Sequence, residues 1–585
     1  MKTNKLKYIS LLLWAFTLMM GCDDGFLDKF PLDTVTHETY WKTESQLKAA
    51  LYPCFADVFH DNLVMYPNVF GSDVVYGDQS SNLVKVPLGR HTALDGFPFT
   101  TFWRYCYAGI FTCNNFLDHY DAAEIPQGTK DVYAAEVKVL RAISYFWLTS
   151  YFGDVPWVDH VITSEEAYGP RTPRSEVVQH LLDDLDWAAS KLGQEIPTGD
   201  NVGRINRWGA LAIKARIALQ NEMWELAAST AKDILDNSPY ELYSDYRTLF
   251  LPESNCEVDP NNKETIISDM FVTDVRMNNM SNLTCMPVDY IRYNPSKRLV
   301  DAYLCSDGKP AKTGLEYYGE ADVQISPLYP SVPEQHYVDY FSNRDPRMSM
   351  TLYTPGDEWP GGDDGDEDID IRNPIFQLPR FQSIQGGTSN RNGANGLTGF
   401  YFKKYNTPEL AGQTNRDYND RHIIRLGEIY LIYAEALFNM QNKTLTQAQI
   451  DATINQLRNR VGMHPMDLTE LGAWGMDLET ELQRERRVEL SFEGLGYFDI
   501  LRWKTGEKFL GKAITGPSFA VCINDLSGKN PYTDNGTDEF GDIVWVKSSV
   551  EGATGSFDPS KHYLWPVPYE ERQKNPGLGQ NPGWE

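Results

Sequence analysis

The chain has few basic residues for its length. Its 585 residues include 53 Lys and Arg against 81 Asp and Glu, which gives a formal net charge of −28 at pH 7. A surface this acidic repels phosphate backbones, so the composition argues against nucleic acid and other polyanions as ligands. Beyond residue 21 the chain also lacks any run of about 18 apolar residues, so we expect no transmembrane helix there.

Cysteines are few as well, and they show no metal-binding pattern. The eight cysteines contain no CxxC pair. Cys106 and Cys113 share one predicted helix, on which a seven-residue rise is about 10 Å and therefore too long for a disulfide. For Cys256, Cys285 and Cys305, one disulfide and free buried thiols both remain open.

Motifs of common enzyme classes are missing too. The sequence has no HExxH and no GxSxG, and its ten histidines are scattered. The segment GEKFLGKA at 506–513 nearly matches the phosphate-loop motif, but Ala513 stands where the magnesium-binding Ser or Thr would be. We therefore reject a nucleotide site and expect no cofactor.

An acidic run is the remaining candidate for a metal site. Asp364, Asp366 and Asp368 alternate in the stretch DDGDEDID, and oxygen ligands at such a spacing can bind calcium. The position that an EF-hand loop reserves for glycine is Ile369, however, and its twelfth position is Ile375. A solvated loop is therefore favoured over a structural calcium site.

The N-terminus has the layout of a secretory signal. Three lysines precede an almost wholly apolar stretch over 8–20, which is too short to span a bilayer comfortably. Cleavage after residue 21 would leave Cys22 at the new N-terminus, as in bacterial lipoproteins. We expect a signal peptide over 1–21 and a lipid anchor on Cys22. An incidental cysteine after an ordinary signal, or an uncleaved anchor, is the alternative.

Helical periodicity dominates the body of the chain. It begins near Glu44 and recurs in "KDVYAAEVKVLRAISYFWLTSYFG" and "PRSEVVQHLLDDLDWAASKL". Ala215, Ala227 and Pro239 follow one another at twelve-residue steps, which match the small, Ala and Pro positions of a tetratricopeptide repeat. The sequence therefore predicts a mainly α fold, a solenoid of helical hairpins. Generic antiparallel helices would give a similar pattern.

The stretch from about 245 to 420 differs in character. It has few helical runs and many Gly, Pro, Asn and Asp residues, and long loops of this kind are usually functional or mobile. The C-terminus is rich in proline and holds two Asn-Pro-Gly turns, which indicate an ordered tail clasped to the body. The expected regions are a signal peptide (1–21), a tethered segment (22–43), a helical region (44–245), a loop-rich, aromatic-rich binding lobe (246–420) and a C-terminal region with the last helix pair and the tail (421–585).

Four segments together resemble the SusD/RagB family: "LRAISYFWLTSYFGDVPWV", "RLGEIYLIYAEAL", "ERRVELSFEGLGYFDILRW" and the terminal "YLWPVP…NPGLGQNPGW". The resemblance spans nearly the whole mature chain, with a departure at Leu495 and Gly496, where the family often has a large basic residue. It implies about four tetratricopeptide-like helix pairs that carry the looped lobe. It also implies a surface lipoprotein of a Gram-negative outer membrane, for which Asp23 and Asp24 fit the export signal.

The resemblance implies binding rather than catalysis. Its members capture oligosaccharides or polysaccharides and deliver them to a SusC-like TonB-dependent barrel in the outer membrane. A peptide-binding relative is the alternative within the family, and a glycoside hydrolase on a helical scaffold is the alternative outside it. Glu485, Glu489 and Glu493 recur on one helical face and could act as an acid and base pair, but the arginines nearby favour ion-paired scaffolding.

Loops rich in aromatic residues hold the candidate binding residues. A flat aromatic ring covers the C–H face of a sugar, while Asp, Asn and Arg bridge its hydroxyls. The resemblance places ligand contacts in the loop after the first helix, which also contains Tyr66, and in loops of the later lobe. For any one of these side chains core packing is the commoner role, but we expect Tyr76, Tyr290 and Trp359 to share one exposed platform. The candidate residues are Asp73, Tyr76, Asp78, Arg90, Tyr290, Tyr293 and Trp359.

Overall fold

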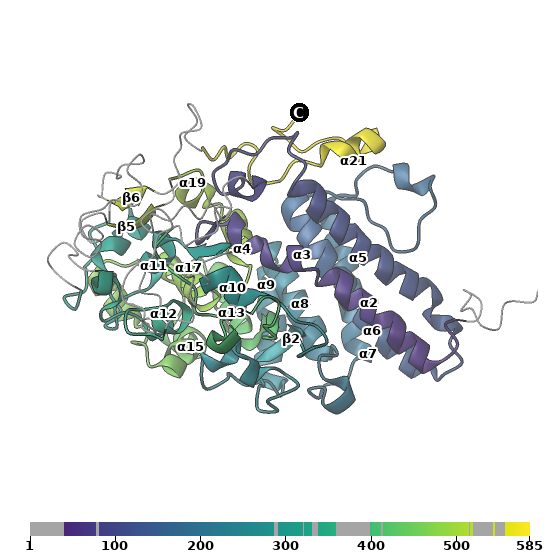
Figure 1. Cartoon of the computed structure of the whole chain (residues 1–585), viewed down its shortest axis with the longest axis horizontal. Helices are drawn as coiled ribbons and strands as arrows, with labels where there is room; N and C mark the ends of the chain where they lie inside the picture. Colours follow the sequence, from purple (N-terminus) through teal and green to yellow (C-terminus); the bar gives the residue numbers. More distant parts are fainter. Residues whose placement is uncertain are drawn as a thin grey trace, which may run out of the picture.

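The computed structural model describes most of the chain. Figure 1 shows long helices packed side by side in one half of the molecule and shorter elements joined by loops in the other half. The described residues are 40–77, 81–285, 291–319, 321–329, 337–358, 398–410, 413–513, 515–518, 542–544 and 556–585. Several predicted site residues lie outside these ranges, so the expectations for them stay predictions: Cys22, Asp78, Tyr290, Trp359, Asp364, Asp366 and Asp368.

Long helices follow one another through the N-terminal half. Each packs against the next, from α2 on α5 to α8 on α9, and α6 also contacts α8. This arrangement confirms the predicted mainly helical fold with tetratricopeptide-like pairs. The helices are α2 (Glu44–Val58), α5 (Phe99–His119), α6 (Gln127–Phe152), α7 (Arg174–Lys191), α8 (Arg207–Gln220) and α9 (Trp224–Asn237).

Local sequence explains where these helices begin, end and cross. The Thr43 side chain accepts a hydrogen bond from the backbone N–H of Gln46, whose side chain in turn accepts from the N–H of Thr43, so a capping box starts α2. Gly153 ends α6 with a φ of 72°, a backbone conformation that glycine adopts readily. Ala215 and Ala227 are fully buried where α8 and α9 pack, as the repeat pattern requires.

The C-terminal helices complete the packing and join the two halves. Helix α13 packs against α9 on one side and against α17 and α15 on the other. In the last helix pair, expected within 421–585, the first arm is one long helix and the second arm is broken into two short helices. These helices are α13 (Leu426–Met440), α14 (Gln447–Asp451), α15 (Ile454–Val461), α16 (Leu468–Trp474), α17 (Leu478–Glu489), α18 (Gly496–Arg502), α19 (Gly506–Phe509) and α21 (Tyr569–Lys574).

Short elements build the other half. The strands form two-stranded antiparallel ribbons, β1 with β3, β2 with β4, and β5 with β6. The loop that we expected after the first helix contains two short helices, a 3₁₀ helix and β1, because elements this short leave no readable periodicity. The elements are α3 (Asp61–Met65), α4 (Pro67–Phe70), α10 (Met280–Cys285), α11 (Lys297–Ala302), α12 (Pro346–Thr351), β1 (Val74–Tyr76), β2 (Thr265–Asp269), β3 (Tyr293–Pro295), β4 (Arg421–Arg425), β5 (Thr515–Ser518) and β6 (Asp542–Val544).

The three glutamates on and after α17 belong to a buried ion network. Arg347 Nη1 donates to Glu485 at 2.6 Å and to Glu489 at 3.0 Å, while Arg425 donates to Glu489 and Glu493 at 2.8 Å each. The scaffolding role is therefore confirmed. The cations come from distant segments, however, while the arginines next to these glutamates pair mainly with other carboxylates.

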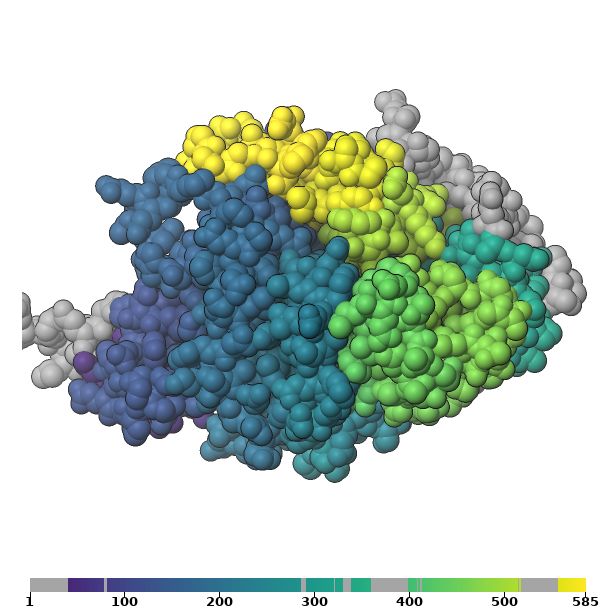
Figure 2. Space-filling model, turned by 180° about the vertical axis from the view of Figure 1, so that it is seen from behind, coloured from purple at the N-terminus to yellow at the C-terminus, as the bar shows by residue number. Residues whose placement is uncertain are grey.

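The C-terminal tail crosses the body and is tightly held. Trp565 is fully buried, and its indole N–H donates to the Tyr497 hydroxyl at 2.9 Å. The Asn581 amide donates to the carbonyls of Phe152 and Trp565 at 2.8 and 2.7 Å. Figure 2 shows the tail, in yellow, lying over both the helical half and the end of the second half. The predicted ordered tail is thus present.

The described part of the chain contains six of the eight cysteines. These six cysteines are free, so Cys256, Cys285 and Cys305 are free thiols and none of them forms a disulfide. Within the described ranges, no three His, Cys, Asp or Glu side chains gather to hold a metal ion. None of the described helices combines the length and apolar character needed to cross a bilayer.

Candidate functional site: an aromatic cluster at the β1–β3 ribbon

The β1–β3 ribbon joins the loop after the first helix to the later lobe. Val74 pairs with Pro295 and Tyr76 pairs with Tyr293. Side chains directly opposite each other in an antiparallel pair share one face of the ribbon. The rings of Tyr76 and Tyr293 accordingly meet edge to face, with centroids 6.0 Å apart. Two residues that the sequence predicted separately for ligand binding are therefore neighbours.

Further rings extend this pair into a cluster. The Tyr66 ring lies 6.3 Å from Tyr76 and 5.8 Å from Phe97, each time edge to face. Tyr66, Tyr76 and Phe97 are half-buried, whereas Tyr293 is only 3% exposed. The Arg292 guanidinium lies 5.8 Å from the centre of the Tyr76 ring. We call Tyr66, Tyr76, Phe97 and Tyr293 the aromatic cluster.

Polar and charged groups lie close to the aromatic cluster. His60 stacks on Tyr105 with ring centroids 3.8 Å apart. Next to His60, the Asp61 carboxylate accepts from Arg421 Nη1 at 2.7 Å, and its side chain is 63% exposed. Asp61 therefore offers carboxylate oxygens to solvent while one side of it is fixed by the arginine.

Burial and charge set the protonation of these groups. Burial, reinforced by Tyr76, raises the pKa of Tyr66 to about 12, so its hydroxyl stays protonated at neutral pH. Burial lowers the pKa of His60, which keeps the imidazole neutral. Burial alone would raise the pKa of Asp61, but Arg421 holds it below its usual value. The cluster thus presents neutral rings and hydroxyls beside one anchored carboxylate.

This combination suits a sugar better than a reacting bond. Half-buried aromatic faces and edges cover C–H groups, and hydroxyls, guanidinium and carboxylate groups form hydrogen bonds with sugar hydroxyls. Glycoside hydrolysis needs two carboxyl groups flanking the scissile bond, about 5–9.5 Å apart. Asp61 is held by Arg421, so it is poorly suited to act as a proton donor. The arrangement supports binding.

The other predicted residues lie elsewhere. Arg90 follows the short 3₁₀ helix Asn82–Lys85, and its backbone N–H donates to the carbonyl of Lys85 at 2.9 Å. Asp73 directly precedes β1, but its carboxylate accepts from Arg487 Nε at 2.6 Å and faces α17. Both oxygens of Asp73 bond to that arginine.

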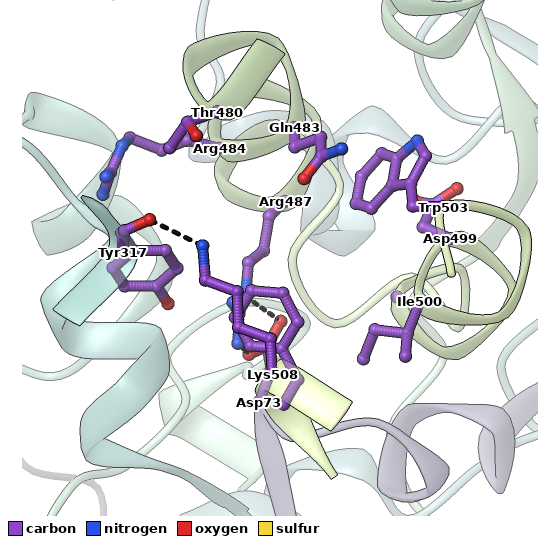
Figure 3. Close-up of a pocket in the computed structure, with 12 residues that line it drawn as sticks. Asp73, Tyr317, Thr480, Gln483, Arg484, Arg487, Asp499, Ile500, Trp503 and Lys508 are labelled. Atoms are coloured by element: carbon purple, nitrogen blue, oxygen red, sulfur yellow. Dashed lines mark hydrogen bonds and ion pairs between the residues drawn. The ribbon is translucent and has the colours of Figure 1, made fainter. Parts of the chain in front are cut away.

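Asp73 lines a small charged cavity that is separate from the aromatic cluster (Figure 3). Lys508 Nζ donates to the carbonyl of Tyr317 at 2.6 Å, and Gln483 and Trp503 line the wall beyond Arg487. The cavity holds about 30 Å³. One water needs roughly 10–15 Å³ measured in this way, so this space suits water rather than a sugar ring.

Sequence reasoning missed several residues of the site. Phe97 precedes a proline, and Tyr105 lies in α5 among residues that the periodicity assigns to a helix. His60 and Arg421 are separated by most of the chain. No pattern along the chain brings these residues together, because their proximity depends on how α3, α5 and β4 pack.

Comparison with known proteins gives one consistent answer. A model of the SusD family matches residues 263–584, and a model described as starch-binding and associating with the outer membrane matches residues 32–219. The chain is 23% identical to SusD-like protein P2 of Formosa agariphila over 608 residues, covering 100% of both chains. It is 22% identical to a SusD-like protein of Bacteroides ovatus, over 84% of this chain and 82% of that one.

Solved structures share the fold. A SusD-like carbohydrate-binding protein of Bacteroides fragilis is 24% identical with a TM-score of 0.75, covering 92% of this chain and 100% of that one. A laminarin-binding SusD-like protein is 19% identical with a TM-score of 0.58, covering 93% and 100%. The shared fold extends over more than nine-tenths of this chain in both cases, and the family model spans more than half of the sequence. The chain therefore belongs to the SusD family.

Proposed function

We propose that this protein binds a carbohydrate at the aromatic cluster, as a non-enzymatic capture protein. The observation that carries the proposal is the meeting of half-buried Tyr66 and Tyr76 with the Arg292 guanidinium and the Asp61 carboxylate. Rings and fixed polar groups of this kind recognise sugars without reacting with them. Membership in the SusD family supports a binding protein over a glycoside hydrolase.

The names of the relatives support the same class of ligand. One solved relative is described as carbohydrate-binding, and another as laminarin-binding. The match to a starch-binding family that associates with the outer membrane points in the same direction. The net charge of −28 favours a neutral glycan over an acidic one. A peptide is the rival ligand.

We further propose where the protein acts. A lipid on Cys22 would anchor the chain in the outer membrane, with Asp23 and Asp24 addressing it to the cell surface. There it would present captured oligosaccharide to a SusC-like TonB-dependent barrel. The N-terminal motif and the family support this placement.

The test uses the purified mature chain and a panel of neutral polysaccharides in affinity gels, followed by calorimetry with fragments of the retained glycan. Tyr66→Ala and Tyr76→Ala should each weaken binding at least tenfold with little change in melting temperature. Tyr168→Ala is the matched control, because Tyr168 is 64% exposed on the loop between α6 and α7.

Three results would overturn the proposal. Unchanged glycan affinity in both cluster variants would mean that the site lies elsewhere. Release of new reducing ends by the wild-type chain would make it an enzyme. Binding of peptides alone, with no polysaccharide retained, would favour the peptide-binding alternative.

A further inference from the structure

A second, larger cavity lies away from the aromatic cluster. Its walls come from the turn between α8 and α9, the end of α13, the outer face of α17 and the end of α18. It holds about 240 Å³, many times the roughly 10–15 Å³ that one water needs. We call this cavity the tryptophan groove and define it by Trp224, Asn439, Lys443, Glu479, Gln483 and Trp503.

The elements that line the tryptophan groove differ from those that carry the aromatic cluster. In Figure 1, α3 and α4, which flank Tyr66 of the aromatic cluster, lie in front, and α8 and α9 lie behind them. Figure 2 shows the molecule from behind, where blue-teal and green segments meet, and α13 packs against both α9 and α17. A short ligand therefore reaches only one of the two sites at a time.

One wall of the groove is a tryptophan held in a fixed orientation. The indole N–H of Trp503 donates to Glu435 Oε1 at 2.8 Å, and Glu435 in turn accepts from Arg502 Nη2 at 2.6 Å. The Arg502 guanidinium also lies 4.8 Å from the centre of the Trp503 ring. An aromatic surface oriented in advance loses little entropy when a ligand binds. Trp503 thus has the properties of a binding platform.

The other side of the groove is polar, and some of its polar groups already form hydrogen bonds with one another. Lys443 Nζ donates to Glu479 Oε1 and to Asn439 Oδ1, both at 2.8 Å. In the described part of the chain, the half-buried amide of Gln483 makes no side-chain hydrogen bond. The mouth of the groove therefore combines a free amide with a fixed carboxylate and a fixed cation.

A backbone feature places the second tryptophan. Glu222, in the turn that precedes Trp224, has a φ of 57°, which is uncommon for a residue other than glycine. The tight turn starts α9 at Trp224, whose half-buried ring lines the groove across from α17. Two tryptophans, one at the start of α9 and one at the end of α18, consequently border one cavity.

The charges of the groove favour a neutral ligand. Glu435 is neutralised by Arg502 and Glu479 by Lys443, which leaves Glu222 as the lining carboxylate without an ion pair among the described residues. Two indole surfaces suit the C–H faces of sugar rings, and the amide and carboxylate suit hydroxyls. We propose that the tryptophan groove is a second carbohydrate-binding site, independent of the aromatic cluster.

Two separate sites make a distinct prediction for binding. Short oligosaccharides should bind in two independent events per chain, whereas a long polysaccharide should gain apparent affinity from engaging both sites of neighbouring molecules. Loss of one site should leave the other intact.

The experiment disables the aromatic cluster first. In the Tyr66→Ala/Tyr76→Ala background, residual retardation of the mature chain is measured in gels containing starch, laminarin and the polysaccharide retained best by the wild type. Adding Trp224→Ala or Gln483→Ala should reduce the residual binding at least tenfold. Trp503→Phe should keep part of it, because the ring remains when the bond to Glu435 is lost. Tyr168→Ala serves again as the control.

Several outcomes overturn this inference. Residual binding that neither Trp224→Ala nor Gln483→Ala changes would place the second site elsewhere. No residual binding in the cluster-disabled background would mean that one site serves the whole protein. A groove that binds a lysine-rich or arginine-rich peptide and no sugar would make it a peptide site. If groove variants lose binding while cluster variants do not, the groove stands and the function proposed for the aromatic cluster fails.

Discussion

Tyr76 and Tyr293 face each other across the β1–β3 ribbon, yet one is half-buried and the other is 3% exposed. The two rings therefore have different expected roles. Tyr76→Ala should cost about 2 kcal/mol of binding free energy, roughly a thirtyfold loss of affinity, at unchanged melting temperature. Tyr293→Ala should instead cost about 3–5 kcal/mol of stability, because it empties a core position. Calorimetry and thermal melts on both variants separate the effects. Equal destabilisation by the two substitutions would contradict a binding role for Tyr76 and a core role for Tyr293.

The clasp of the tail should contribute strongly to stability. Trp565 stacks parallel on Tyr151 at 4.2 Å and donates to Tyr497. Trp565→Ala should lower the free energy of unfolding by about 3–5 kcal/mol. Trp565→Phe should cost about 1–3 kcal/mol, since it removes the donor and part of the ring. Tyr569→Ala, in the same tail but 44% exposed, is the control. Denaturant unfolding with no difference among the three would contradict a structural role for the tail.

Removing one carboxylate from the buried ion network should strongly destabilise the folded protein. Glu489 accepts from Arg347 and Arg425 and also pairs with Arg460, and it is fully buried. Glu489→Gln leaves buried guanidinium groups without full compensation, which should cost about 3–5 kcal/mol. The exposed pair of Lys232 and Asp236 gives the comparison, because Asp236→Asn should leave the melting temperature unchanged. A mild effect of Glu489→Gln would show that water or neighbouring carboxylates replace the lost charge.

A buried histidine should make stability depend on pH. His91 is 4% exposed and packs 4.8 Å from His562, and burial together with His562 lowers its pKa to about 3. In the unfolded chain the pKa is about 6.5. The folded state therefore binds fewer protons than the unfolded chain. The contribution of His91 to the free energy of unfolding is complete above about pH 6.5 and is lost as the pH falls toward 3.

His91→Phe should flatten this dependence. The free energy of unfolding of the variant should decline less than that of the wild type between pH 6.5 and acid, as measured by urea titration at several pH values. His180→Phe, at a side chain 42% exposed on α7, should leave the slope as in the wild type. Parallel curves for His91→Phe and the wild type would refute the assignment of the titration to His91.

The proposed lipid anchor can be tested independently of ligand binding. Cys22→Ala should abolish incorporation of labelled palmitate and leave the protein soluble or mislocalised, because the proposed lipid is attached to that cysteine. Ligand affinity should be unchanged, since the described fold begins at residue 40. Labelling that persists in the variant would exclude lipidation at this position.

The sequence alone determined the features that depend on the order of residues within one segment of the chain. Apolar periodicity predicted the long helices, and the spacing of Ala215 and Ala227 predicted the close packing of α8 and α9. The C-terminal motif predicted a tail held on the body, as Trp565 demonstrates. These features repeat or extend over many residues, so they leave a readable pattern.

Only the tertiary structure decided which distant residues meet. The register that places Tyr76 opposite Tyr293, the pairing of Glu489 with Arg347 and Arg425, and the closeness of Trp224 and Trp503 all join separate segments. No periodicity encodes such contacts, because each depends on how several elements pack at once. The sequence proposed aromatic residues for binding, but packing determined which of them remain half-buried and which fill the core.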